Sequence, residues 1–95
     1  MPTTVGLVHL SIHVTQAMSL KDKRRIIKSF KTRVANGYNV SIAEVDALDS
    51  HRSAVLAVAM VGNDRRHVAG ALQKIINAAS SHRDMVLVDY EVEWL

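Results

Sequence analysis

The chain has 95 residues, of which 48% are hydrophobic and 22% are charged, and its formal net charge is +3 at pH 7. This composition excludes a disordered tail or an acidic activation segment. It predicts one globular domain over residues 1–95, a size near the lower limit for a core without disulfide or metal support. Because cysteine is absent, disulfides, iron–sulfur clusters, thiolate zinc sites and cysteine nucleophiles are excluded, and a reducing cytoplasm is the expected location. The chain lacks a signal-peptide pattern and any apolar run of about 20 residues, so insertion into a membrane is not expected.

The first strand is predicted over residues 5–14, where apolar and polar side chains alternate with a period of two. The core-facing set is expected to be Val8, Leu10, Ile12 and Val14. A helix follows, for which Ser19 and Asp22 form a capping box with Asp in place of Glu. Gly37 is expected to end this helix in the left-handed conformation.

Two further strands are predicted over residues 38–45 and 54–61, joined by a polar segment as an antiparallel pair. Residues 62–64 offer a turn and an N-cap for a second helix. Its apolar stripe is expected to be Val68, Leu72, Ile75 and Ala79. Residues 85–94 alternate again and predict a last, half-buried strand.

The order of these elements, βαββαβ, predicts an α+β, ferredoxin-like fold. We expect a four-stranded antiparallel sheet in the order 4-1-3-2, with both helices on one face. In this order the third strand is central, and residues 54–61 are apolar on both of its faces. Helices cover one face, so a second protomer is expected to cover the apolar strip on the other. We therefore predict a two-fold homodimer formed through the sheet face or an edge.

The first helix has an unusual charge distribution. Residues 19–33 contain seven of the twelve Lys and Arg residues and one acid, Asp22. At 100° per residue the bases occupy one arc and the apolar side chains another. This basic arc consists of Lys21, Arg24, Arg25, Lys28 and Lys31. The arc is interpreted either as a phosphate-binding surface, supported by Ser19 and the N–H groups of the first turn, or as the solvated face of an amphipathic helix.

Several segments together resemble one known family across essentially the whole chain. They are SLKDKRR after the first strand, YNVSIAEVD, GND before the second helix, and YEVEWL at the end. The chain resembles the YlxP-like family of small bacterial proteins, a domain of unknown function. The resemblance implies a ferredoxin-like fold and a bacterial source. Genes of the family commonly lie near those for translation initiation and ribosome maturation factors, which implies work on or near the ribosome. The positions that match the basic motif are Lys21, Lys23, Arg24 and Arg25.

The aromatic residues argue against reading of single-stranded bases. Ferredoxin-like RNA-recognition domains stack bases on aromatic side chains of their central strands. The aromatic residues here fall outside the first and third strands: Phe30, Tyr38, Tyr90 and Trp94. Structured RNA recognised by shape is therefore favoured over single strands, and Phe30, Tyr90 and Trp94 are expected to pack in the core or at an edge.

Two clusters could support metal or acid–base chemistry. His9 and His13 share a strand face and would lie beside acids of the last strand, Asp89, Glu91 and Glu93. Roughly 13 Å separates the two imidazoles, too far for one ion, so cross-strand charge pairs are the favoured interpretation. The second cluster is Glu44, Asp46, Asp49 and His51. Loop acids of this kind more often bond their own backbone.

The second helix begins with Asn63 or Asp64 as a cap, followed by Arg65, Arg66 and His67. Arg65 and Arg66 are expected to be surface charge, which would extend a polyanion footprint if both helices present their bases on the same side. A phosphate-cradling glycine loop, an acylphosphatase signature and a Ser-His-Asp arrangement are absent. The sequence thus favours a non-enzymatic binding module without metal or cofactor, which engages phosphates of structured, ribosomal RNA. The predicted contacts are Lys21, Lys23, Arg24, Arg25, Lys28 and Lys31. The alternatives are an assembly domain that docks an acidic protein and, least favoured, a metal-dependent enzyme.

Overall fold

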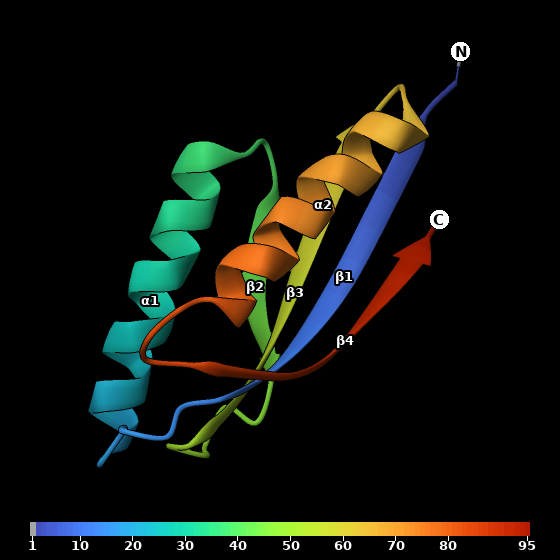
Figure 1. The fold of residues 1–95 in the computed structure, drawn as a ribbon. Helices are drawn as coiled ribbons and strands as arrows, with labels where there is room; N and C mark the ends of the chain where they lie inside the picture. Colours follow the sequence, from blue (N-terminus) through green and yellow to red (C-terminus); the bar gives the residue numbers. More distant parts are fainter. Residues whose placement is uncertain (1) are drawn as a thin grey trace.

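A computed structural model describes residues 2–95 and has the predicted order βαββαβ (Figure 1). The six elements are β1 Thr4–His13, α1 Leu20–Gly37, β2 Ser41–Asp46, β3 Ser53–Gly62, α2 Arg65–Ser80 and β4 Val86–Trp94. The strands form one antiparallel sheet in the order β2-β3-β1-β4. This order is the predicted 4-1-3-2 read from the other edge, so the ferredoxin-like α+β fold is confirmed.

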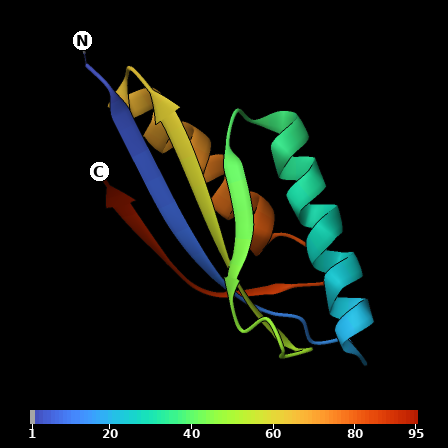
Figure 2. The same ribbon diagram turned by 180° about the vertical axis from the view of Figure 1, so that it is seen from behind.

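Both helices lie on one side of the sheet. α1 packs against β2, and α2 packs against β1, β3 and β4. Seen from behind, the strands lie in front of α2, with α1 beside the β2 edge (Figure 2). We call the side without helices the open face. Alternation along the strands sends every second side chain to this face.

The core lies between the sheet and the helices. The predicted set Val8, Leu10, Ile12 and Val14 is buried; the first three lie on β1, and Val14 directly follows it. From the central strand β3, the buried side chains are Ala54, Leu56, Val58 and Met60. The apolar stripes of the two helices close the core, and Phe30 of α1 is fully buried in it. The alternation in β1 and β3 is therefore confirmed.

The helix N-termini are capped as the sequence predicts. Ser19 Oγ accepts a hydrogen bond from Asp22 N (3.1 Å), and Asp22 Oδ2 accepts one from Met18 N (3.1 Å). This reciprocal arrangement is a capping box in which the acid reaches one residue beyond the cap. Asp64 caps α2 by accepting from Arg66 N (3.0 Å).

The end of α1 differs from the prediction. Gly37 is the last helical residue, and its φ is not positive, so the expected left-handed cap is wrong. Tyr38, in extended conformation, caps the helix instead and donates its N–H to Val34 O (3.0 Å). Because this residue is used as the cap, β2 begins at Ser41 rather than at residue 38.

The last strand is less buried than the alternation predicts. Val86, Val88, Tyr90 and Val92 are exposed, Val88 by 67%, whereas Trp94 is half-buried. A bulge leaves Val88 unpaired and places Leu87 opposite the buried Ile12, so Leu87 packs against the core and Val86 lies opposite His13 on the open face. β4 is also an edge strand, which leaves Tyr90 and Val92 partly uncovered. Among residues 2–95, neither helix has the length and apolar character that crossing a membrane requires.

Candidate functional site

The fold separates positive from negative charge. Within residues 2–95, seven of the twelve Lys and Arg residues lie in α1, three in α2 and two in loops, and none in a strand. Five of the nine acids lie in the strands, two in β2 and three in β4. The helix layer is therefore strongly positive and the sheet is negative. A polyanion would be attracted to the helices and repelled by the sheet.

The basic arc of α1 is accessible. Lys21, Arg24, Arg25 and Lys28 are exposed, and Lys31 is half-buried. The opposite side of the helix is buried in the core, where Ile26, Ile27, Phe30 and Val34 lie. The helix thus has the two faces that its periodicity predicts. The arc can present several cations to one ligand because its members lie three or four residues apart.

Lys23 does not belong to this surface. Its side chain is fully buried, and its ammonium group contacts Glu44 Oε2 (2.7 Å), Ala47 O (2.9 Å) and Ser53 O (3.1 Å). A longer contact reaches Leu48 O (3.5 Å), so all three N–H donors of the lysine have acceptors within the protein. The prediction that Lys23 contacts phosphate is therefore wrong, since the group has internal partners and no access to a ligand.

The Lys23 contacts connect α1 to the β2–β3 loop. Glu44 comes from β2, Ala47 lies at the start of the loop with a φ of 58°, and Ser53 begins β3. One ammonium group therefore holds both ends of the loop against the first turns of α1. Lys23 and Glu44 belong to the two most specific segments of the family resemblance, SLKDKRR and NVSIAEVD, so the ion pair gives these segments a common structural role.

A cleft of about 540 Å³ lies beside the basic arc. It separates α1 from the turn between α2 and β4, which passes the middle of α1 (Figure 1). The lining residues are Arg25, Ile26, Ser29, Arg33, Ser81, His82, Arg83 and Asp84. Three arginines and one aspartate therefore line one space.

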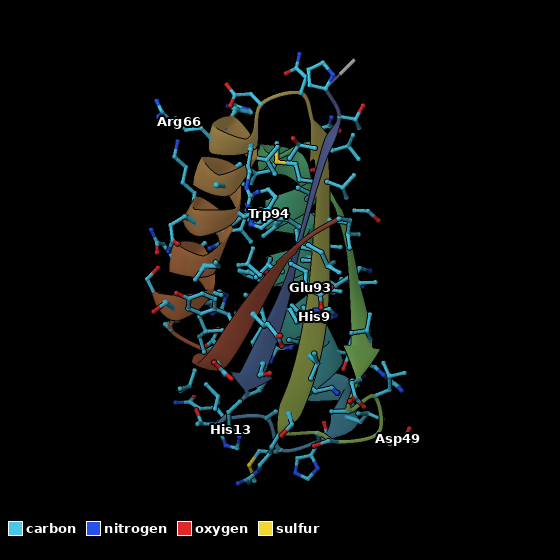
Figure 3. The ribbon with its side chains drawn as sticks, turned by 90° about the vertical axis from the view of Figure 1, so that its right-hand side faces the viewer. His9, His13, Asp49, Arg66, Glu93 and Trp94 are labelled. Atoms are coloured by element: carbon cyan, nitrogen blue, oxygen red, sulfur yellow. The ribbon has the colours of Figure 1, made fainter. Side chains whose placement is uncertain are left out.

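The predicted histidine and acid cluster forms only in part. The register pairs His9 with Glu91 and places Asp89 opposite Ser11 on the open face. Figure 3 shows Glu93 close to His9, while His13 lies farther along the sheet. A bulge between Ser11 and Ile12 shifts the register, so the residue opposite His13 is Val86 rather than an acid. The expected cross-strand pairing is therefore limited to His9 opposite Glu91, since the residues opposite Asp89 and Glu93 are Ser11 and Leu7.

The loop acids do not converge on one ion. Glu44 is paired with Lys23, and Asp46 Oδ1 accepts from Ala47 N (2.7 Å). Asp49 and His51 are exposed in the loop (Figure 3 labels Asp49). Across residues 2–95, no three His, Asp or Glu side chains come close enough to hold a metal ion together.

The start of α2 combines capping with packing. Asp64 is the cap, and the guanidinium carbon of Arg65 lies 4.5 Å from the centre of a Trp94 ring. This distance is typical of a cation–π contact. Arg66 and His67 are exposed and lie beside a second, shallower hollow with Lys74. Arg65 therefore helps to hold β4 to α2.

Comparison with known proteins identifies the family. The family described as "Protein of unknown function (DUF503)" matches residues 5–92. The chain belongs to the DUF503 family. It is 29% identical over 90 residues to the "Uncharacterized protein YlxP" of Bacillus subtilis (strain 168), a match that covers 95% of this chain and 98% of that protein. The family resemblance predicted from the motifs is confirmed.

A solved structure with the same architecture is the "De novo designed protein Foldit4". It aligns with this DUF503 chain at a TM-score of 0.57 and 14% identity, over 98% of this chain and 96% of the designed one. At this level of identity the similarity shows a common fold and carries no information on function.

Of the charged residues that line the cleft of this DUF503 protein, the sequence pattern indicates only Arg25 as a ligand contact. Arg33 is one of the helix bases but falls outside the predicted arc, and no motif marks His82 or Arg83. Their neighbourhood depends on how the α2–β4 turn crosses α1, which no local pattern encodes. The spacing of Arg25, Ser29 and Arg33, four residues apart, is the signal that could have indicated one continuous polar row.

Proposed function

We propose that the protein is a non-enzymatic binding module that engages the phosphates of structured RNA, in the cytoplasm, through the exposed bases of α1. The observation that supports this proposal most directly is the segregation of charge between the helix layer and the sheet. The contacts are Lys21, Arg24, Arg25, Lys28 and Lys31. Contacts of cationic side chains with phosphates give affinity and orientation without reading sequence.

The composition of the open face supports recognition from the helix side. Its central strands present small or aliphatic side chains such as Leu7, Ala57 and Ala59, and its β4 edge presents carboxylates. The central strands β1 and β3 contain no Lys, Arg, Phe, Tyr or Trp, so a single-stranded RNA would find only the His9 and His13 rings to stack on and no lysine or arginine cation there. Ribosomal RNA is the first RNA to test, because genes of the family commonly lie near those for ribosome maturation factors.

Charge reversal on α1 tests the proposal. We expect Arg24→Glu combined with Lys28→Glu to weaken binding of ribosomal RNA at least ~10²-fold at fixed salt, since each lost charged hydrogen bond contributes about 1.5–3 kcal/mol. Both side chains are exposed and lie outside the cleft, so the fold is retained. Binding is measured by filter retention or fluorescence anisotropy.

The matched control is Arg66→Glu combined with Lys74→Glu, which makes the same change in net charge on α2. We expect this control to lose only a few-fold in affinity, through weakened long-range attraction. Equal losses in the two variants would mean that RNA responds to net charge alone, and would contradict a binding surface on α1.

The open face also supports the proposal of a homodimer. Its apolar residues form a continuous strip across the central strands, including Leu7, Val55 and Val61, and Val61 is 60% exposed. The carboxylates of β4 border this strip. An apolar centre with a polar rim is the usual anatomy of an interface. A second copy of the chain, packed face to face about a two-fold axis, would cover it.

The edges favour this face over edge-to-edge pairing. β2 has six residues and a register shift between Glu44 and Asp46, and such irregular, short strands are poor templates for pairing. An antiparallel pair of β4 strands centred on Glu91 would bring Asp89 of one copy opposite Glu93 of the other. Like charges in this position are destabilising.

A single substitution tests the dimer. Ala57 lies at the centre of the open face, between His9 on β1 and Ala43 on β2. We expect Ala57→Glu to convert a dimer to a folded monomer in sedimentation equilibrium, because a carboxylate would be buried unpaired in the interface. Ala35→Glu, on the exposed side of α1, is the matched control and leaves the dimer intact. A wild-type protein that remains monomeric at high micromolar concentration would rule out the dimer.

A further inference from the structure

The cleft between α1 and the α2–β4 turn has the construction of an anion site. From α1, Arg25, Ser29 and Arg33 line one wall at intervals of four residues, so they form a row along one side of the helix. The turn supplies the other wall with Arg83 and His82. The volume of about 540 Å³ lies within the range of pockets for small ligands. Polar groups from two separate elements therefore converge on one space.

The net positive charge of the residues that line the cleft favours an anionic ligand. Three arginines, Arg25, Arg33 and Arg83, line the cleft together with one acid, Asp84. Asp84 Oδ2 lies 3.8 Å from Arg83 Nε, so it offsets one of the three positive charges. The lining then has a net charge of +2 with a neutral His82. A phosphomonoester carries about −1.5 to −2 at pH 7, whereas a phosphodiester of an RNA backbone carries about −1, so the cleft matches the monoester better.

The hydrogen-bond donors also fit a phosphate. His82 Nδ1 accepts a hydrogen bond from Asp84 N (3.1 Å), so the proton of a neutral imidazole lies on Nε2, which is a donor. The His82 ring lies edge-on to the buried Phe30 ring, with 6.1 Å between centroids, and this contact fixes its position. Guanidinium groups add planar pairs of donors that suit phosphate oxygens.

We infer that this cleft binds the phosphate of a phosphomonoester, held by Arg25, Arg33 and Arg83 with His82 as a further donor. The phosphate is carried by a free nucleotide or sugar phosphate, or by the 5′ end of an RNA. The site goes beyond the proposed RNA surface, with which it shares Arg25. Its other ligand-binding residues, Arg33, His82 and Arg83, lie outside the predicted basic arc, and His82 and Arg83 belong to a different element.

Titration with adenosine 5′-monophosphate, followed by ¹⁵N-resolved NMR, tests the inference on the full chain. We expect saturable shifts in the amides of residues 81–84 and of the α1 row, and no such shifts with adenosine. Arg33→Glu combined with Arg83→Glu should raise the Kd at least ~10-fold. The control Arg24→Glu combined with Lys28→Glu makes the same charge change outside the cleft and should alter this Kd less than threefold.

Two results would overturn the inference. One is an equal response to adenosine and to its monophosphate. The other is equal weakening by the cleft variant and the control, which would reveal a general attraction to positive charge. Both results are independent of ribosomal RNA binding, which is measured separately and depends on Arg24 and Lys28.

A second arm distinguishes the sources of the phosphate. One RNA hairpin is compared with a 5′-phosphate and with a 5′-hydroxyl. A tighter complex with the phosphorylated hairpin, lost in the Arg33→Glu and Arg83→Glu variant, identifies an RNA terminus as the ligand. Equal binding of the two hairpins, with the nucleotide shifts retained, identifies a free phosphomonoester.

Discussion

Lys23 has a role that its neighbours in the basic segment do not share. It lies between bases that are exposed, yet its ammonium group is fully buried against Glu44 and backbone carbonyls. The helical period contains the explanation, because position 23 falls on the same arc as Ile26, Ile27 and Phe30. Counting basic residues without their angular position therefore overestimates the binding surface by one.

We predict that Lys23→Met lowers the free energy of unfolding by about 3–5 kcal/mol, measured by urea denaturation. Removing one partner leaves Glu44, whose side chain is 13% exposed, without its counter-ion, and leaves loop carbonyls without a donor. Under conditions where the variant is folded, its RNA affinity should equal that of the wild type. Unchanged stability together with lost RNA binding would instead make Lys23 a phosphate contact.

At the scale of elements, periodicity and capping could predict most of the fold. The alternation in β1 and β3, the apolar stripe of α2 and the caps at Ser19 and Asp64 all follow from local physical chemistry. The end of α1 could not be predicted in the same way. A glycine permits a left-handed cap but does not require one, and Tyr38 N–H satisfies the helix end without it.

Properties that depend on packing between elements could not be predicted from the sequence pattern. Val88 of β4 is exposed because it lies at a sheet edge and at a bulge in the pairing with β1. The cleft likewise depends on a turn that crosses α1 far from it in sequence. Strand alternation indicates which side chains share a face, but it does not indicate how much of that face a helix covers.

Substitutions at two glycines test two different effects on stability, steric overpacking at Gly6 and helix propensity at Gly70. A Cβ on Gly6 of β1 would lie 2.8 Å from Leu72 Cδ1 and 2.9 Å from Val68 Cγ1, whereas a Cβ on Gly70 of α2 would meet nothing within 4 Å. We predict that Gly6→Ala destabilises the protein by about 1–3 kcal/mol through overpacking. Gly70→Ala should stabilise it by about 0.5–1 kcal/mol, because alanine is the better helix former. Chemical denaturation of both variants checks the pair, and equal effects would contradict the close approach of α2 to β1.

At the scale of the whole molecule, the fold converts a linear pattern into two surfaces of opposite charge. Bases cluster in the helical segments of the sequence and acids in β2 and β4. Because both helices pack on the same side, their bases share one layer, while the carboxylates of β4 border the open face. The sequence could predict both the cluster and the fold that orients it. It does not encode a ligand, since phosphate contacts require only charge and spacing.

The most direct measurement of the central claim is co-sedimentation of the protein with ribosomal subunits and with free ribosomal RNA, from about 50 to 200 mM salt. The five bases of the α1 arc, four of them exposed and Lys31 half-buried, would replace condensed counterions and predict a slope of log affinity against log salt of roughly −3.5 to −4.5, or a loss of about 10² or more over this range. The Arg24→Glu and Lys28→Glu variant should reduce this slope by about 2. Absence of binding at 50 mM salt, or binding whose strength does not change with salt, would contradict an RNA surface on α1.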